Sequence, residues 1–301
     1  MTTRKVPSPA HRADLTLARR VERQIGRVFS SHESVATAEA IAAYAEAVGE
    51  TGAVQDGSGP PHPVRRIPPT FLFTLGIAKP RPFEVYDELG IDQARILHAE
   101  QSFTFLAPVV AGQRLTFTPH LDGVGEKRDG ALLLVTVTTA VTDPTSRAIA
   151  ELGTVIAVRQ AMSAGAPARA VRGGAGAPAS IKPVIAMPPI TRETLARFAA
   201  ASGDGNPLHL DSAAARAAGF DDVIAHGMLI AAYAGRAVEQ WFPGRAIARF
   251  ATRFTGITRL GDVVTLSLAD GDPATDPRRF IVSAHDHRGE AKLRSEVIFT
   301  A

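Results

Sequence analysis

Apolar residues follow helical spacing in two short stretches, one in each half of the chain. Residues 36–48 and 192–202 are rich in alanine, glutamate and leucine, which are strong helix formers, and their apolar residues recur near every third or fourth position. Each stretch is followed by a glycine, Gly49 or Gly203, the residue that most often ends a helix. The pattern predicts two helices at equivalent places in two similar halves.

Downstream of each helix, the pattern changes to the alternation of period two that is typical of half-buried strands. Strands are predicted at 100–106, 113–122, 132–140 and 149–158 in the first half and at 247–254, 263–269, 279–284 and 292–299 in the second. Matching turns are predicted at 110–113 and 259–262, and hairpins at Asp129-Gly130 and Arg288-Gly289. A helix followed by an antiparallel sheet in each half gives the α+β class.

Two further segments complete the organisation of the chain. Residues 228–234 are apolar throughout, and the stretch that they open runs to Trp241 before Pro243-Gly244, which is typical of a helix buried on every side. Residues 162–180 are rich in Gly, Ala and Pro, which predicts a flexible connector. We therefore expect a first unit over residues 1–160, a linker over 161–182 and a second unit over 183–301.

Composition narrows the classes of function. Lys and Arg number 33 against 30 Asp and Glu, without the clustered basic face that nucleic-acid binding needs. No apolar run reaches the roughly 18–20 residues that cross a bilayer, and the polar N-terminus lacks a secretory segment. The absence of cysteine excludes thiol catalysis and Cys-based zinc sites and fits a reducing compartment. We expect a cytoplasmic protein with no nucleic-acid or membrane partner.

The residues best suited to chemistry follow the second predicted helix. Gly203 and Asn206-Pro207 favour a turn. Across this turn, Asp204 and His209 can converge on one cleft, where a carboxylate and an imidazole hold a water or a substrate hydroxyl for general acid–base catalysis. The alternative is that Asp204 only caps the turn and that His209 is an ordinary surface or core residue.

The start of the buried helix offers a second element of a site. His226 and Gly227 stand at its amino end, where unpaired backbone N–H groups and the positive end of the helix dipole favour negative charge. Glycine there lets a ligand approach the backbone closely, which suits an oxyanion site for a carbonyl that gains enolate character. His226 is interpreted either as a participant in proton transfer or, more simply, as a helix-start histidine that bonds to backbone.

These two motifs together resemble the signature of MaoC-like dehydratases, a group that includes the (R)-specific, or type 2, enoyl-CoA hydratases. The likeness is carried by Gly203-Asp204-Gly205-Asn206-Pro207-Leu208-His209 and by Ala225-His226-Gly227-Met228. It covers the chain from about Pro188 to the C-terminus. The resemblance implies an α+β double hot-dog fold, in which two antiparallel sheets each wrap around a central helix.

The resemblance also implies the activity and the roles of the site residues. The activity is reversible hydration of enoyl thioesters, or dehydration of (R)-3-hydroxyacyl thioesters, carried by CoA or acyl carrier protein; such a hydro-lyase needs no cofactor and no metal. Asp204 and His209 are the catalytic pair, and which of them moves which proton stays open. Gly227 holds the thioester carbonyl with His226 beside it, whereas Asn206 either buttresses the loop or lies nearer the substrate.

The first half resembles the non-catalytic partner of (R)-3-hydroxyacyl-ACP dehydratases and of fused double hot-dog hydratases. The likeness lies in Ile96-Leu97-His98-Ala99-Glu100-Gln101-Ser102-Phe103 and in Pro108-Val109-Val110-Ala111-Gly112. Aligning the two predicted helices places Glu50 opposite Asp204, Gln55 opposite His209 and Pro69-Thr70 opposite His226-Gly227. The first half is therefore expected to bind the acyl chain, with Phe71 and Phe73 either lining a tunnel or packing in the core.

Several alternatives stay open. A hot-dog thioesterase would also bind acyl thioesters but would release free thiol, and a non-catalytic acyl-thioester-binding module would bind without turnover. Arg245, Arg249 and Arg253 either meet a carrier phosphate or are solvated strand residues. A fused double unit of this kind either acts alone or pairs into a homodimer.

Overall fold

The computed structural model describes residues 16–50, 67–127, 131–160, 181–271 and 276–301. The first half contains α1 (Leu17–Glu22), β1 (His32–Val35), α2 (Ala38–Ala47), α3 (Phe71–Ile77), α4 (Glu84–Glu88), the 3₁₀ helix η2 (Gln93–Arg95), β2 (Ile96–Phe105), β3 (Arg114–Lys127), β4 (Leu132–Thr142) and β5 (Ala148–Arg159). The second half contains β6 (Ile185–Ala186), α5 (Arg192–Ser202), the 3₁₀ helix η3 (Pro207–His209), α6 (Ser212–Ala217), α7 (Gly227–Trp241), β7 (Ile247–Phe254), β8 (Thr265–Asp270), β9 (Arg279–His285) and β10 (Ala291–Phe299). The predicted helices and strands are present in both halves, which confirms the α+β class.

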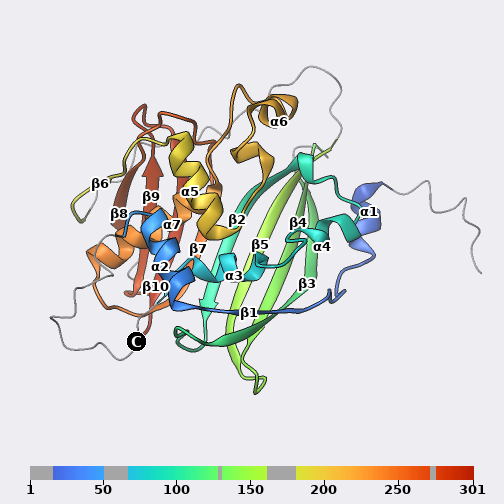
Figure 1. Cartoon of the computed structure of the whole chain (residues 1–301), viewed down its shortest axis with the longest axis horizontal. Helices are drawn as coiled ribbons and strands as arrows, with labels where there is room; N and C mark the ends of the chain where they lie inside the picture. The colour runs from blue at the N-terminus through green and yellow to red at the C-terminus, as the bar shows by residue number, and fades with distance from the viewer. Residues whose placement is uncertain (1–15, 51–66, 128–130, 161–180, 272–275) are drawn as a thin grey trace, which may run out of the picture.

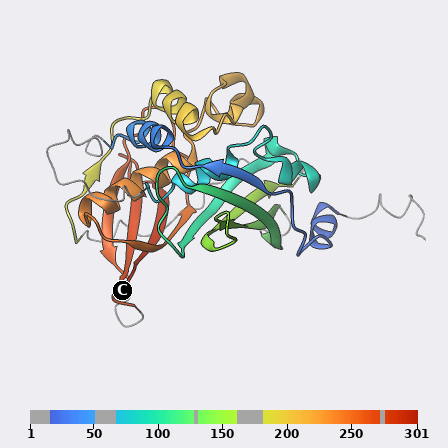
Figure 2. The same ribbon diagram turned by 60° about the horizontal axis from the view of Figure 1, so that its bottom comes forward.

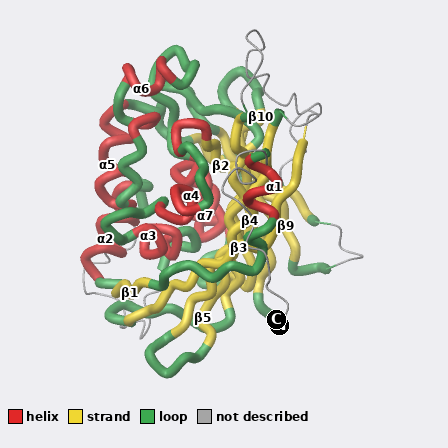
Figure 3. Tube along the Cα trace, turned by 90° about the vertical axis from the view of Figure 1, so that its right-hand side faces the viewer, coloured by secondary structure: helices red, strands yellow, loops and turns green. Residues whose placement is uncertain are grey.

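The strands of the described residues join into one antiparallel sheet, in the order β1-β3-β4-β5-β2-β7-β10-β9-β8-β6 (Figure 1). Two separate sheets were expected, but β2 pairs with β7 and joins the halves edge to edge, with Glu100 opposite Arg253 and Thr104 opposite Arg249. This pairing satisfies the backbone groups that two free edge strands would expose. Helices α2, α3 and α5 gather on one side of the sheet (Figure 3).

The two halves begin with the same backbone arrangement. Thr37 caps α2 and Thr191 caps α5, and each side chain accepts a backbone N–H at 3.1 Å. The turns that open the two sheets are tied back to these caps: the N–H groups of Gly112 and Gly261 each donate, at 2.8 Å, to the carbonyl of the residue before the cap. Both glycines have left-handed backbones, with φ of 83° and 81°, which other residues rarely adopt. The duplication predicted from the sequence pattern is thus visible in matching hydrogen bonds.

The central helices distinguish the two halves. α7 is buried along nearly its whole length, as predicted, whereas its counterpart α3 has less than half as many residues. α2 and α5 lie side by side over the sheet (Figure 2), and the rings of Tyr44 and Phe198 meet between them at 5.8 Å. One continuous hydrophobic core spans both halves. The fold is therefore the double hot-dog, in which each half wraps strands around its own helix.

Some of the sequence predictions concern residues outside the described ranges. These are Gln55, the Asp129-Gly130 hairpin and the connector as far as residue 180, so the unit boundaries at 160 and 183 stay predictions. Among the described helices, none combines the length and the apolar composition needed to cross a membrane.

Candidate active site

The turn after α5 is built by local hydrogen bonds. Gly203 ends the helix in the left-handed conformation, with φ of 74°, as glycine at this position commonly does. The Asn206 side chain caps η3 by accepting from the N–H of Leu208 at 3.1 Å, and the Asp204 carboxylate accepts from the N–H of Asn206 at 3.3 Å. These bonds favour the interpretation that Asn206 buttresses the loop.

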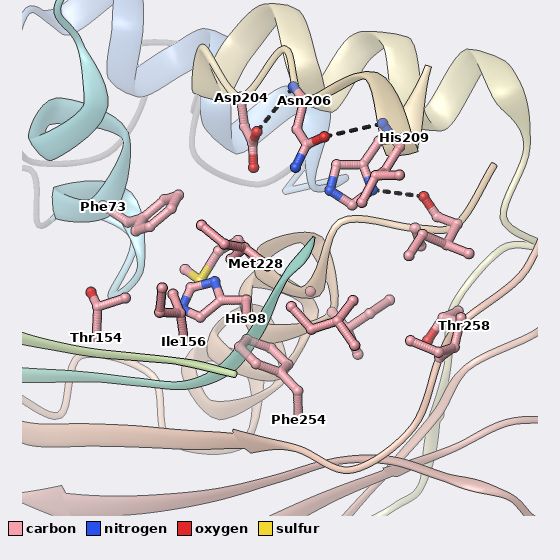
Figure 4. A pocket seen from close by; sticks show the side chains of 18 of the residues that line it. Phe73, His98, Thr154, Ile156, Asp204, Asn206, His209, Met228, Phe254 and Thr258 are labelled. Carbon is pink, nitrogen blue, oxygen red and sulfur yellow. Dashed lines mark hydrogen bonds between the residues drawn. The ribbon is translucent and has the colours of Figure 1, made fainter. Parts of the chain in front are cut away.

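Asp204 and His209 converge across this turn (Figure 4). A carboxylate oxygen of Asp204 and ring nitrogens of His209 and His226 lie within 4.8 Å of one another. The Nδ1 of His209 is 2.8 Å from the carbonyl oxygen of Ile224, which can only accept. Nδ1 therefore donates, and Nε2 keeps a lone pair that can take a proton.

Burial sets the protonation of this pair. Asp204 is 8% exposed, and burial raises its pKa, while the charge of His209 and the N–H of Asn206 lower it. Burial lowers the pKa of His209, while the charge of Asp204 and the bond to Ile224 raise it. Removal from water favours the neutral acid and the neutral imidazole, and mutual attraction favours the ion pair. Two titrating groups with opposed effects of this kind form a coupled pair suited to moving protons.

His226 lies behind the pair. It is fully buried, its Nε2 is 3.1 Å from the backbone carbonyl of Asp204, and its ring centroid is 3.9 Å from that of His209. Burial, followed by the charge of His209, lowers the pKa of His226 to about 3, against the opposing hydrogen bond to Asp204. The ring is therefore neutral near pH 7. This geometry favours the simpler interpretation, in which His226 ties the catalytic turn to the start of α7.

Gly227 opens α7 and lines the same pocket. A Cβ atom on this residue would lie 3.2 Å from the ring of Phe254, so glycine keeps the backbone accessible at the amino end of the helix. The chain segment that leads into α7 is fixed because the N–H of Ala225 donates to the carbonyl of Thr258 at 2.9 Å. The N–H of Leu229 donates to the carbonyl of His226 at 3.1 Å. The N–H groups of the first two helix residues, Gly227 and Met228, have no carbonyl one turn earlier in the helix and can bind an oxyanion.

The pocket in front of these residues lies between the halves and encloses about 140 Å³. Its wall from the first half includes Phe73, Phe83, Tyr86, His98, Thr154 and Ile156. Of the two phenylalanines proposed for a tunnel, Phe73 lines the pocket, whereas Phe71 is fully buried in the core against Tyr44. No pattern in the sequence predicted that His98 would be part of this wall.

The three arginines considered for phosphate binding interact with other side chains. Arg253 forms an ion pair with Glu100 at 2.7 Å, and Arg249 with Glu296 at 3.2 Å. The guanidinium of Arg245 lies 4.1 Å from the ring centroid of Phe299. These contacts favour the solvated strand-face interpretation over phosphate binding.

A buried network of ion pairs lies next to the pocket. The Nζ of Lys292, whose side chain is 1% exposed, is 2.9 Å from Asp286 and donates to the carbonyl of Ile257 at 2.9 Å. Arg288 reaches both Asp286 and Asp262 at 2.9 Å. Because Ile257 stands next to Thr258, the network stabilises the segment that holds the start of α7. The predicted turn at Arg288-Gly289 is present, but the buried lysine gave no signal in the sequence pattern.

The same histidines raise the question of a metal site. Asp204, His209 and His226 offer three donor atoms within 4.8 Å of one another. A tetrahedral zinc ion with bonds of about 2.0–2.1 Å needs donors about 3.3 Å apart. The Nε2 of His226 already donates to a backbone carbonyl, so the only donor atom left on that ring is Nδ1, which is buried and has no partner among the described residues.

Comparisons with known proteins match a different family model to each half of the chain. Residues 180–280 match the MaoC like domain, and residues 23–152 match the FAS1-like dehydratase domain region. The chain is 27% identical over 215 residues to 3-hydroxyacyl-thioester dehydratase X of Mycobacterium tuberculosis, covering 70% of this chain and 72% of that protein.

Solved structures show the same fold. The MaoC-like dehydratase from Phytophthora capsici superimposes with a TM-score of 0.71 at 19% identity, covering 94% of this chain and 98% of that one. HtdX of Mycobacterium tuberculosis superimposes with a TM-score of 0.66 at 24% identity, covering 91% of this chain and 100% of that one. The fold defines a double hot-dog protein, and one of its halves brings a carboxylate and an imidazole together in a pocket. The chain contains a MaoC-like domain over residues 180–280, preceded by a FAS1-like dehydratase region over residues 23–152.

Proposed function

We propose that this protein is a hydro-lyase that hydrates enoyl thioesters and dehydrates (R)-3-hydroxyacyl thioesters. The observation that carries the proposal is the convergence of Asp204 and His209 in a pocket that also exposes the amino end of α7 at Gly227. A similar protein bears the name 3-hydroxyacyl-thioester dehydratase, which supports a thioester substrate.

In the hydration direction, the thioester carbonyl accepts a hydrogen bond from the Gly227 N–H, and the helix dipole stabilises the enolate as it forms. Asp204 and His209 hold the attacking water at C3. One of them takes a proton from this water as the C3–O bond forms, and a proton returns to C2 as the enolate collapses. Dehydration is the reverse. No cofactor takes part, because the thioester itself acidifies C2.

The two halves have different roles in this proposal. The first unit, residues 1–160, binds the acyl chain through the apolar wall that includes Phe73 and Ile156, and the second unit, residues 183–301, supplies the catalytic pair. The thioester is carried by CoA or acyl carrier protein. We further propose a cytoplasmic enzyme, consistent with its lack of cysteine, that acts as a single chain or as a homodimer; sedimentation at assay concentration distinguishes these two states.

The test of the proposal is an assay with crotonyl-CoA that follows two signals together. Loss of enoyl absorbance without release of free thiol, and formation of (R)-3-hydroxybutyryl-CoA, are the expected results. Thiol release at the rate of absorbance loss would identify a thioesterase, and binding without either signal would identify a non-catalytic module. Either of these outcomes contradicts the proposal.

A further inference from the structure

A histidine that the proposed reaction does not use lines the pocket from the first half. His98 lies on β2, across the pocket from Asp204 and His209 (Figure 4). Its ring centroid is 5.7 Å from that of Phe73 and 5.0 Å from that of Phe254. The imidazole is therefore held between aromatic side chains that come from both halves.

A β-bulge directs His98 into the pocket. The register of β2 against β5 shifts between His98 and Glu100, so that His98 stands opposite Ile156, where regular pairing would place Ala99. Residues opposite each other in an antiparallel pair share a face of the sheet, and Ile156 lines the pocket. Without the bulge, the imidazole would point to the other face. Bulges are common next to active sites, where they redirect a side chain.

The two ring nitrogens of His98 have different surroundings. Nε2 is buried and has no hydrogen-bond partner within the described part of the chain. Burial lowers the pKa of His98 to about 4, while hydrogen bonds with the Gln101 side chain and the Glu100 backbone raise it. Because Nε2 has no partner among these residues, it keeps a free lone pair when the proton is on Nδ1.

Gln101 is itself fixed in place. It is 1% exposed, its Oε1 accepts from the hydroxyl of Thr154 at 2.9 Å, and its Nε2 donates to the carbonyl of Ser102 at 3.2 Å. The side-chain amide therefore has a defined orientation in the strand that carries His98. This ordered shell belongs entirely to the half that lacks the catalytic pair.

We propose that His98 is a positioning residue, whose Nε2 accepts a hydrogen bond from an O–H or N–H group of the bound thioester. This inference rests on the proposed function. A buried acceptor without a partner is unfavourable, and the substrate class offers two donors. One is the hydroxyl at C3, and the other is the amide N–H that follows the sulfur in a pantetheine arm. The first half would then orient the substrate as well as enclose its acyl chain.

The experiment compares two substitutions of His98 in the full chain. His98→Phe keeps an aromatic ring between Phe73 and Phe254 but removes the acceptor, so kcat/KM for crotonyl-CoA is expected to fall about tenfold. His98→Gln places an amide oxygen near the position of Nε2, so kcat/KM should stay within about threefold of wild type. The matched control is His32→Phe, because His32 also has a buried, unpartnered ring nitrogen among the described residues and stacks on Phe117, yet lies outside the pocket.

Two further substrates distinguish the donors. Crotonyl-N-acetylcysteamine keeps the amide, and the ethyl thioester of crotonate lacks it. If the amide is the donor, the His98→Phe defect disappears with the ethyl thioester; if the C3 hydroxyl or the attacking water is the donor, the defect persists with both.

Three outcomes overturn the inference. They are wild-type kcat/KM in His98→Phe, an equal loss in His98→Phe and His98→Gln with unchanged melting temperatures, and an equal loss in His32→Phe. Inactivity of the wild-type protein on every substrate would instead refute the proposed function, and this inference with it.

Discussion

Helices α2 and α5 end in the same way but lead to different surroundings. Gly49 and Gly203 both adopt the left-handed conformation, with φ of 76° and 74°. After Gly203 the chain forms the turn that carries Asp204 to the pocket. At the end of α2, the guanidinium of Arg236 from α7 lies directly beside Gly49 and donates to the carbonyl of Val48 at 3.3 Å. The backbone of the helix end is therefore common to both halves, and the side chains around it decide where chemistry is possible.

The hairpins between the last two strands of each half show the same contrast. Asp143 and Asp286 each accept two backbone N–H groups within their turns, and each turn contains a left-handed residue, Ser146 or Gly289. Asp286 is buried against Lys292, whereas Asp143 remains partly exposed. The second half thus adds a buried ion network to a turn that does not require one. If the halves differ in this way, substitutions at equivalent positions should have unequal effects.

The largest effect is expected at the ends of the two helices. Asp204→Asn removes the carboxylate that we propose to transfer protons, and kcat for crotonyl-CoA hydration should fall by about 10²–10⁴, the usual contribution of general acid–base catalysis. Glu50→Gln, at the equivalent position of the first half, should leave kcat unchanged. Equal losses in the two variants would show that the asymmetry is not catalytic.

A large loss of stability is expected at the buried network. Lys292→Met leaves Asp286 and Asp262 with only the half-exposed Arg288 as a cationic partner among the described residues, so the free energy of unfolding should fall by up to about 3–5 kcal/mol. Asp143→Asn, in the more exposed turn between β4 and β5, should lower the free energy of unfolding much less. Urea denaturation of both variants measures the difference, and a mild effect of Lys292→Met would mean that water reaches the network.

A smaller effect is expected at two glycines of α7. A Cβ on Gly227 would press on Phe254 at 3.2 Å, whereas one on Gly235 would make an ordinary contact with Pro69 at 3.5 Å. Gly227→Ala should therefore lower kcat/KM by about tenfold to hundredfold, part of the loss seen when an oxyanion donor is removed. Gly235→Ala should keep wild-type activity. Steady-state kinetics measures the effect in both variants. Full activity of Gly227→Ala would contradict the proposed role of Gly227 in the oxyanion site.

The smallest effect concerns pH and is expected at His98 of the first half and His226 of the second, which are both neutral near pH 7. Burial lowers the pKa of His98 to about 4 and that of His226 to about 3, against about 6.5 in the unfolded chain. Below pH 6.5 the unfolded state binds protons that the folded state does not, so stability is complete above that value and is lost as the pH falls towards the folded values. Between pH 7 and pH 5, each of these histidines should lower the free energy of unfolding by about 2 kcal/mol.

His98→Phe removes one of these two groups. Urea unfolding at pH 7 and pH 5 should therefore show a loss of stability about 2 kcal/mol smaller in the variant than in the wild type. The same loss in both proteins would indicate that His98 is protonated in the folded state.

Much of the fold could be predicted from the sequence because its elements are strongly patterned. The bounds of α5 and β7 follow from spacing alone, and the turns at Gly112 and Gly261 follow from their glycines. The junction of β2 with β7 could not be predicted, because alternation shows which residues share a face but not which strand lies alongside.

The site was predictable only where it is local in sequence. Asp204 and His209 belong to one turn, so residue types and spacing brought them together. His98 depends on a bulge that reverses the alternation of β2, and Lys292 depends on partners from two connections, β7–β8 and β9–β10. Features that arise from long-range packing leave no local pattern from which they can be predicted.

The central claim is that Asp204 and His209 act as one unit on a thioester. The most direct measurement is kcat for crotonyl-CoA hydration by Asp204→Asn, His209→Ala and the double variant, with unfolding curves to confirm that each is folded. Groups that act together are strongly non-additive, so the double variant should be no slower than the slower single variant within about threefold. Losses that multiply in the double variant, or single variants within about tenfold of wild type, would contradict the account.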